Sequence, residues 1–351
     1  MPHRGVRKDH EINEKWDTVE IRTDSLPISW NGNPFYSMGR LCYADMYYCH
    51  ILQFDIKSGD FICKSLGKGH ANSEIPDFMY AYPVKNNDEK ICIVNSSLYM
   101  YVYNNKTSEI EKKGKIDFGW SNVKSDDYAS PSLYSVMELS DFGVDIYERE
   151  NQNLIFPVNV VDRNALNPHE RFEKGRIWAE MNYEDFHIGC LYGKFPPIYR
   201  KTPSPGFDYF QYAMNDGLFY ANHAIDSLIY VCSDQGEPLF SFGFDSPMAD
   251  RSYSVSKEHF DESTFEKDAK HVSFNTGLDY IPETEQIIRT ICFDPKEPKT
   301  CIQIYDGKAF DLIYETHVDG IYKYLTYQEG KYIGTSLYQD EKSSIYYLTI
   351  K

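Results

Sequence analysis

The sequence predicts an all-β fold, and the architecture that suits it best is a six-bladed β-propeller. Short apolar-aromatic strands recur along most of the 351 residues, several pairs are joined by compact polar turns, and aromatic residues make up 16% of the chain. The clearest hairpin lies within 49–66, where the strands HILQFDI and FICKSL flank the turn KSGD. Tyrosine and phenylalanine suit a pleated, half-buried surface, and a meander of ~40–45 residues is the size of one propeller blade.

The chain is expected to begin with a disordered polar lead, residues 1–16, followed by a single propeller domain over 17–351. The alternating segment TVEIRTD predicts a first strand over 18–24, and the Pro- and Asn-rich stretch after it is a connector. A first unit runs from about residue 35 to residue 66, with the strand-like pieces RLCYAD, HILQFDI and FICKSLG. A second unit follows at 78–116 with the strand-like pieces FMYAYPV, KICIVN, LYMYVYN and EIEKKGKI.

The remaining units are expected to follow the same pattern, with one longer member. The third contains LYSVMEL, GVDIYE, NLIFPVNVV, RIWAEMN and HIGCLYGKF, with a polar insertion around 162–174. The fourth covers 208–244, where Asp-Gly and Gln-Gly turns give good hairpin chemistry. A short surface helix is predicted within 256–270, and the fifth unit comes next, at 272–315.

The two chain ends predict how the ring closes. The sixth unit, from residue 321 to the end, offers only three strands, and the lone strand at 18–24 can complete it. Pairing the two ends removes the exposed edges that a linear array of sheets would leave. The count is therefore six blades, or seven if the third unit divides in two.

Composition excludes several classes of function. The formal net charge of −17 repels phosphate backbones, so we expect no nucleic-acid binding. No stretch approaches the roughly 20 apolar residues of a membrane span. The start of the chain lacks the apolar core of a signal peptide, so either the protein stays in the cytoplasm or an export segment lies upstream.

Eight cysteines without a CxxC pair predict free thiols, mostly buried in strands.

The most distinctive local candidate for a binding site is the glycine-containing segment at 67–74. In a propeller it would link the outer strand of one blade to the inner strand of the next. Its glycines could let backbone amides meet an anion, with three side chains as polar contacts. The alternative is a plain turn that needs glycine for its backbone, and such turns are much commoner than anion sites. The candidate binding residues are Gly67, Gly69, His70, Asn72 and Glu74.

No catalytic residue, metal site or cofactor is expected. The ten histidines show no metal-type spacing, and neither a GxSxG elbow nor a P-loop is present. The carboxylates of Asp126 and Asp127 in the run 125–127, and those of Asp141, Asp145, Glu148 and Asp185, would suit glycoside hydrolysis only if two of them meet in space. Aromatic platforms for sugar rings could come from Trp120 and Trp178.

Two long segments resemble the TolB-like six-bladed propellers of unknown function found in gut Bacteroidetes. The first runs from HILQFDI to LYMYVYN and contains a Gly-x-Gly segment ending in Asn-x-Glu, here 67–74, with His70 at the family's usual proline position. The second is FNTGLDYIPETEQIIRTICF. The resemblance implies a propeller over 18–351 and, since family members are typically exported and often lipid-anchored, a place in the cell envelope or periplasm. It implies no particular reaction.

Two functions follow from this sequence, and a third remains open. The first is a non-catalytic monomeric propeller that binds an unknown protein or glycan ligand on its channel face. The alternative is a sugar-directed hydrolase or lyase that draws residues from several blades. A subunit of a larger envelope assembly is the third possibility, and an exposed apolar patch would indicate it.

Overall fold

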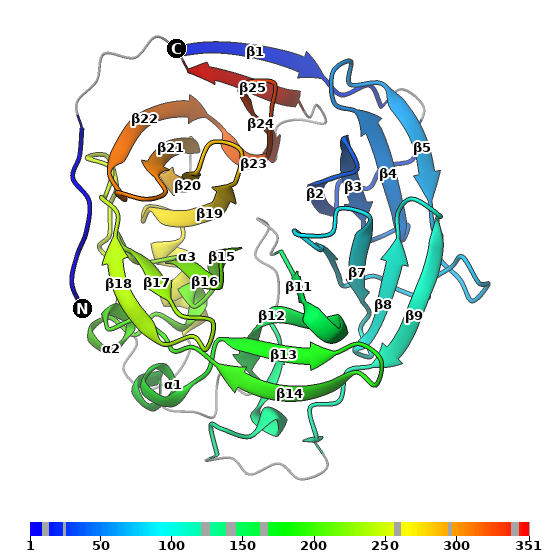
Figure 1. Ribbon diagram of the computed structural model, residues 1–351, viewed down its shortest axis with the longest axis horizontal. Coiled ribbons are helices and arrows are strands. Elements are labelled where there is room, and N and C mark those ends of the chain that lie inside the picture. The colour runs from blue at the N-terminus through cyan, green and yellow to red at the C-terminus, as the bar shows by residue number, and fades with distance from the viewer. Residues whose placement is uncertain are drawn as a thin grey trace.

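The computed structural model is a six-bladed β-propeller with its blades arranged around a central axis (Figure 1). It describes residues 1–8, 14–23, 26–120, 127–137, 145–161, 168–255, 261–293, 297–337 and 344–350. Six sheets are formed by these residues, and the inner strand of each faces the axis. The all-β fold and the six-bladed count predicted from the sequence are confirmed.

Blades 1 and 2 match the first two predicted units and are simple antiparallel meanders. Blade 1 consists of β2 (Gly32–Ser37), β3 (Arg40–Asp45), β4 (His50–Asp55) and β5 (Phe61–Ser65). Blade 2 consists of β6 (Tyr80–Pro83), β7 (Lys90–Val94), β8 (Tyr99–Asn104) and β9 (Glu109–Lys115).

Blade 3 contains the long third unit as one sheet, so no seventh blade arises. Its innermost layer is shared by β10 (Tyr134–Val136) and β11 (Tyr147–Arg149), which both pair with β12 (Asn153–Val160). The sheet continues through β13 (Trp178–Asn182) and β14 (His187–Tyr192). Helix α1 (Pro168–Lys174) lies in the predicted polar insertion, of which residues 162–167 are outside the described part of the chain.

Blades 4 and 5 are again four-stranded. Blade 4 consists of β15 (Phe210–Asn215), β16 (Leu218–His223), β17 (Ile229–Cys232) and β18 (Pro238–Phe242). Blade 5 consists of β19 (Phe274–Ile281), β20 (Gln286–Phe293), β21 (Lys299–Asp306) and β22 (Leu312–Asp319). The links around them contain α2 (Ile198–Lys201) and α3 (Glu262–Asp268). The predicted surface helix is therefore present, although 256–260 lie outside the described residues.

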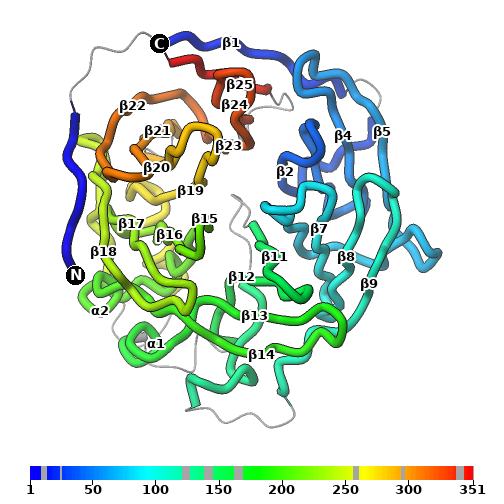
Figure 2. The backbone as a smooth tube through the Cα atoms, in the orientation of Figure 1, coloured from blue at the N-terminus to red at the C-terminus, as the bar shows by residue number. Residues whose placement is uncertain are grey.

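Blade 6 is built from both ends of the chain, as predicted, but the first strand lies at 14–20 rather than at the expected 18–24. It contains β23 (Ile321–Gln328), β24 (Lys331–Leu337) and β25 (Ser344–Ile350), and β1 (Glu14–Glu20) adds the outermost strand. The register runs antiparallel from Glu14 opposite Ile350 to Glu20 opposite Ser344. The backbone tube in Figure 2 shows β1 and β25, the first and last strands of the chain, side by side.

The first eight residues also lie against the ring. Backbone bridges join His3 to Ser241 next to the outer edge of blade 4, and Arg7 to Leu312 on blade 5. The segment thus runs outside two blades before the chain reaches β1 (Figure 2). The division of the chain into a lead over 1–16 and one domain over 17–351 stays a prediction.

The hairpins between the third and fourth strands owe their shape to one recurring turn. The Asp55 carboxylate accepts hydrogen bonds from the backbone amides of Lys57 and Ser58, at 2.9 and 2.8 Å. Asn104 in blade 2 and Asp306 in blade 5 do the same for the residues that follow them. An Asx side chain that mimics a turn of backbone closes a hairpin with little help from neighbouring blades.

The apolar faces of adjacent blades pack against one another to form the core. Tyrosine and phenylalanine dominate the contact between blades 3 and 4, where the centroid of the buried Trp178 ring lies 4.7 Å from that of Phe219.

All eight cysteines are free thiols, and six of them are buried. No helix among the described residues is long and apolar enough to cross a membrane.

Candidate functional site

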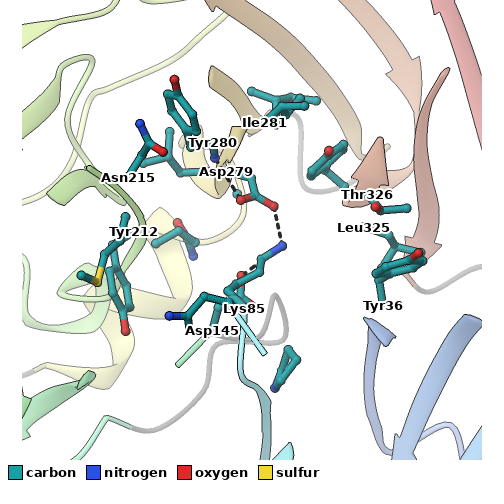
Figure 3. A pocket seen from close by; sticks show the side chains of 18 of the residues that line it. Tyr36, Lys85, Asp145, Tyr212, Asn215, Asp279, Tyr280, Ile281, Leu325 and Thr326 are labelled. Atoms are coloured by element: carbon teal, nitrogen blue, oxygen red, sulfur yellow. Dashed lines mark hydrogen bonds and ion pairs between the residues drawn. The ribbon is translucent and has the colours of Figure 1, made fainter. Parts of the chain in front are cut away.

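A cavity of about 550 Å³ opens on the propeller axis, where the inner strands converge. Figure 3 shows side chains from different blades pointing into this space. Every blade contributes to the lining, which includes Phe35, Tyr36, Lys85, Asp88, Asp145, Tyr147, Gln211, Tyr212, Asn215, Asp216, Asp279, Tyr280, Glu283, Lys323, Tyr324 and Tyr327. We call it the channel cavity.

An ion cluster of one lysine and two aspartates crosses the channel cavity (Figure 3). The ammonium of Lys85 forms an ion pair with Asp279, and its Nζ lies 3.6 Å from Oδ2 of Asp145. Lys85 lies two residues after the end of β6, Asp145 two residues before the start of β11, and Asp279 is on β19. The cluster therefore joins blades 2, 3 and 5 at the axis.

Backbone pairing holds two members of this cluster in place. The amide of Lys85 donates to the carbonyl of Ile146 at 2.8 Å, and the amide of Ile146 donates to Pro83 at 3.1 Å. This short parallel contact between blades 2 and 3 places the side chains of Lys85 and Asp145 next to one another. Asp279 is fixed separately, because Oδ1 accepts from the amide of Tyr280 at 2.9 Å.

Burial and neighbouring charges shift the pKa values of Lys85 and Asp279. Burial opposes the charge on Lys85, but Asp145 and Asp279 outweigh that effect and raise the pKa of its ammonium. Burial raises the pKa of the Asp279 carboxyl above its usual range, and Lys85 opposes the shift. An ionised carboxylate has more acceptor sites than its contact with Lys85 uses, so Asp145 and Asp279 can still accept hydrogen bonds from a ligand's hydroxyl groups.

A second lysine in the channel cavity has a different environment. Lys323 on β23 donates from Nζ to the backbone carbonyl of Pro34 in β2, at 2.7 Å. Burial lowers the pKa of its ammonium to about 8, with Asp145 opposing and Lys85 reinforcing that shift. The charge of this side chain therefore changes close to neutral pH.

One buried amide in the channel cavity is left without a partner. Gln211 on β15 is 6% exposed, and neither its Oε1 nor its Nε2 has a hydrogen-bond partner among the described residues. Buried polar atoms are nearly always hydrogen-bonded in folded proteins. Both polar atoms are covered in this structure, so a ligand or ordered water would satisfy the amide after a small movement of the cavity lining.

Several tyrosines line the cavity. Tyr147 and Tyr212 lie with ring centroids 5.3 Å apart, and Tyr220 stacks on Tyr280 at 5.8 Å. Burial raises the pKa values of Tyr147 and Tyr212 well above the ordinary value. These phenols therefore stay neutral at physiological pH.

The segment predicted as the binding site lies elsewhere and satisfies much of its own polar surface. It links β5 to β6, as expected, but none of Gly67, Gly69, His70, Asn72 and Glu74 is among the cavity-lining residues. The Glu74 carboxylate folds back to accept from the amide of Ala71 at 3.0 Å. It also covers Gly69, where a Cβ would stand 2.0 Å from Oε2 of Glu74. Anion binding by this segment stays a prediction.

The other sequence candidates have mixed outcomes. Asp145 does line the channel cavity, whereas Glu148 forms an ion pair with Lys90 at 2.8 Å. Residues 125 and 126 and Asp141 lie outside the described part of the chain. The expected sugar platform at Trp178 is wrong, because that side chain is fully buried between blades. Trp120 is 40% exposed, away from the cavity lining, and stacks on Phe118.

Sequence reasoning missed Lys85, Gln211, Asp279 and Lys323. Each is a polar residue within the first, innermost strand of its blade or, for Lys85, two residues after it. A polar residue that recurs on the first strand of successive units is the signal that could have indicated a channel site.

Comparisons with known proteins support the fold. No family model matches this sequence, and no curated protein is similar to it. Among solved structures, a DUF4221 family member from Bacteroides vulgatus aligns with a TM-score of 0.73 at 12% identity, over 97% of this chain and 98% of its own. A Bacteroides fragilis protein inferred to be exported aligns with a TM-score of 0.57 at 13% identity, over 99% of each chain. Such low identities establish a shared fold alone.

Proposed function

We propose that this protein is a non-catalytic propeller that binds a neutral sugar, at the end of a glycan chain, in its channel cavity. The observation that carries the proposal is Gln211, a buried amide that lines the cavity with both polar atoms unpartnered among the described residues. A cavity of about 550 Å³ lies within the usual range for small-ligand pockets, about 300–1,000 Å³.

The chemistry of the lining supports a sugar over other ligands. Carboxylates, ammonium groups and amides can accept from and donate to hydroxyl groups, and tyrosine rings offer flat surfaces to the apolar faces of sugar rings. The carboxylates of Asp88, Asp145, Asp216, Asp279 and Glu283 outnumber the ammonium groups of Lys85 and Lys323 in the lining. This balance disfavours an anionic ligand.

A panel of neutral, acidic and amino sugars tests the proposal by calorimetry and thermal shift. We expect neutral oligosaccharides to bind, and Gln211→Ala and Asp279→Asn each to weaken the affinity about tenfold, because each removes hydrogen bonds to the ligand. Asp319→Asn, an exposed position at the end of β22, is the matched control. The proposal is wrong if no neutral sugar binds, or if the channel variants bind it as tightly as the unchanged protein.

One observation favours a second candidate, a sugar-directed hydrolase or lyase. Asp145 and Asp279 both approach the same ammonium, so two carboxylates lie close together at the axis. Glycosidases need such a pair, with one carboxyl group protonated, and the pKa of Asp279 is raised by burial. Lys85 ties up both carboxylates, which is why binding is the first proposal. Release of reducing ends that Asp279→Asn abolishes would establish the enzyme.

We further propose that the protein acts as a monomer in the cell envelope and belongs with the TolB-like propellers. The exported description of the Bacteroides fragilis structure supports this placement. A protein partner on the channel face is the other ligand class to test. Fractionation of cells that carry a tagged copy would overturn the envelope assignment if the protein is found only in the cytosol.

A further inference from the structure

A cysteine, a glutamate and a histidine come together on the outer half of blade 5, away from the channel cavity. The ligand atoms of Cys301, Glu315 and His317 all lie within 4.8 Å of one another. None of the three lines the channel cavity. The cluster has no part in the proposed sugar binding and is argued independently of it.

Strand register explains why these three side chains meet. Cys301 on β21 is directly opposite His317 on β22, and Gln303 is opposite Glu315 two positions along the ladder. Paired residues and residues two apart share one face of a sheet. The three groups therefore leave the same face of the same two strands, and both strands are fixed by ladder hydrogen bonds.

The identity of the groups selects the ion. A thiolate, an imidazole and a carboxylate are the ligand types that Zn²⁺ takes in proteins, at about 2.0–2.3 Å from the metal. A set of three protein ligands leaves a fourth tetrahedral position for water. A thiolate and a carboxylate also balance the charge of a divalent cation. Magnesium and calcium prefer all-oxygen sites, so they suit this cluster poorly.

Neighbouring side chains contact two of the three proposed ligands, Glu315 and His317, as the residues around a metal site contact its ligands. Gln303 donates from Nε2 to Oε2 of Glu315 at 2.7 Å, and Phe293 packs edge-on against the His317 ring at 5.6 Å. Outer contacts of this kind orient metal ligands. Cys301 is fully buried beside Ile291 and Phe293, whereas His317 is exposed, so an ion can enter from the histidine side.

The N-terminal segment places a cation against the same carboxylate. Nη2 of Arg7 lies 3.1 Å from Oε2 of Glu315 and 3.2 Å from the carbonyl oxygen of Asp245. The guanidinium therefore competes with a metal ion for Glu315. Removing it should tighten metal binding, provided that the ion uses this carboxylate.

We propose that Cys301, Glu315 and His317 form a Zn²⁺ site on the outer half of blade 5. The site takes the ion with three protein ligands and one water, and Arg7 at the end of the N-terminal segment weakens it by pairing with Glu315. This assignment replaces the expectation of no metal site that the histidine spacing suggested.

Cobalt titration tests the site, because Co²⁺ bound to a thiolate gives a charge-transfer band in the near ultraviolet. Full-length protein is stripped with a chelator, titrated with Co²⁺, and then titrated with Zn²⁺ to displace it. We expect the band in the unchanged protein and its bleaching by Zn²⁺. We expect Cys301→Ser to abolish the band and His317→Ala to weaken cobalt affinity at least about tenfold, as loss of a ligand should.

Matched controls keep the test decisive. Cys190→Ser and His271→Ala change an exposed cysteine and an exposed histidine elsewhere and should leave the titration unchanged. Arg7→Ala should tighten cobalt binding by about fivefold or less, the value of a partly exposed ion pair. If Cys301→Ser does not fold, the exposed His317 variant decides alone. The site is refuted if the unchanged protein gives no band, or if His317→Ala titrates as the unchanged protein does.

Discussion

The ammonium of Lys323 bonds to a backbone carbonyl rather than to a carboxylate, and its pKa of about 8 lies well below the ordinary value of 10.5. Between these two values the unfolded chain holds a proton that the folded chain has released. The contribution of Lys323 to the free energy of unfolding therefore rises as the pH increases from about 8 to 10.5. Below pH 8 the folded protein bears the full cost of a half-buried charge.

Replacing Lys323 with methionine should stabilise the protein near neutral pH. We expect a gain on the order of 2 kcal/mol in the free energy of unfolding at about pH 7, which shrinks toward zero by about pH 10. The lost bond to Pro34 reduces the gain equally at every pH. Urea denaturation of the unchanged protein and of Lys323→Met from pH 7 to pH 10 measures the difference in their free energies of unfolding. Titratable groups that both proteins share contribute equally to both and drop out of this difference.

The exposed Lys64 on β5 provides the control for this experiment. Lys64→Met should change stability by a few tenths of a kcal/mol at most, with no trend against pH. A gain for Lys323→Met that stays constant from pH 7 to pH 10 would contradict the assigned proton affinity.

Single residues of the site were the hardest feature to predict from the sequence. Asp145 was among the carboxylates considered, but its relation to Lys85 and Asp279 depends on the ring, since Lys85 and Asp279 are 194 positions apart. No local pattern encodes a contact over that separation. The segment at 67–74 was conspicuous because glycine motifs are visible in a sequence, whereas a lone polar residue on an inner strand is not.

At the scale of strands and blades, the sequence was far more informative. The hairpin turns at Asp55, Asn104 and Asp306 are closed by their own side chains, so their residues predict them without knowledge of neighbours. The short helices α1 and α2 were not predicted: α1 lies in the segment interpreted only as a polar insertion, and the four residues of α2 have too few turns for a periodic pattern.

Contacts between blades depend on side chains that the strand pattern does not reveal. Arg289 on β20 is fully buried, and its guanidinium donates to the carbonyls of Ser227 and Asp226 at 2.7 and 3.0 Å. It also donates to Oδ1 of Asn275 at 2.9 Å. The side chain thereby ties the inner edge of blade 5 to the turn that follows β16 in blade 4.

Removing this contact should be costly. We expect Arg289→Met to lower the free energy of unfolding by about 3 kcal/mol, because it leaves buried carbonyl oxygens without donors. Arg22→Met is the matched control, since Arg22 forms an exposed ion pair with Asp60 worth less than about 1 kcal/mol. Chemical denaturation measures the free energy of unfolding of both variants. If Arg289→Met and Arg22→Met lose the same amount, the contacts of Arg289 between blades 4 and 5 do not stabilise the protein.

At the scale of the whole molecule, the ring depends on seven residues from the beginning of the chain. Without β1, the edge of β25 would expose a row of unpaired amides and carbonyls, which is a template for association with other chains. The side chain of Trp16 adds apolar contact, packing edge-on against Tyr322 and Tyr346 at 6.1 and 6.5 Å. The sequence predicted this closure because the last unit lacked one strand.

Two truncations separate closure of the ring from the contacts of the first eight residues. Removal of residues 1–8 keeps β1, so we expect a folded monomer with a modestly lower melting temperature. Removal of residues 1–20 takes β1 away, and we expect a larger loss of thermal stability together with concentration-dependent oligomers in light scattering, because β25 becomes an open edge. A peptide covering Glu14–Glu20, added in trans, should partly restore the monomer by refilling that edge. If the longer truncation is as stable and as monomeric as the shorter one, the pairing of the two chain ends is not what stabilises the ring.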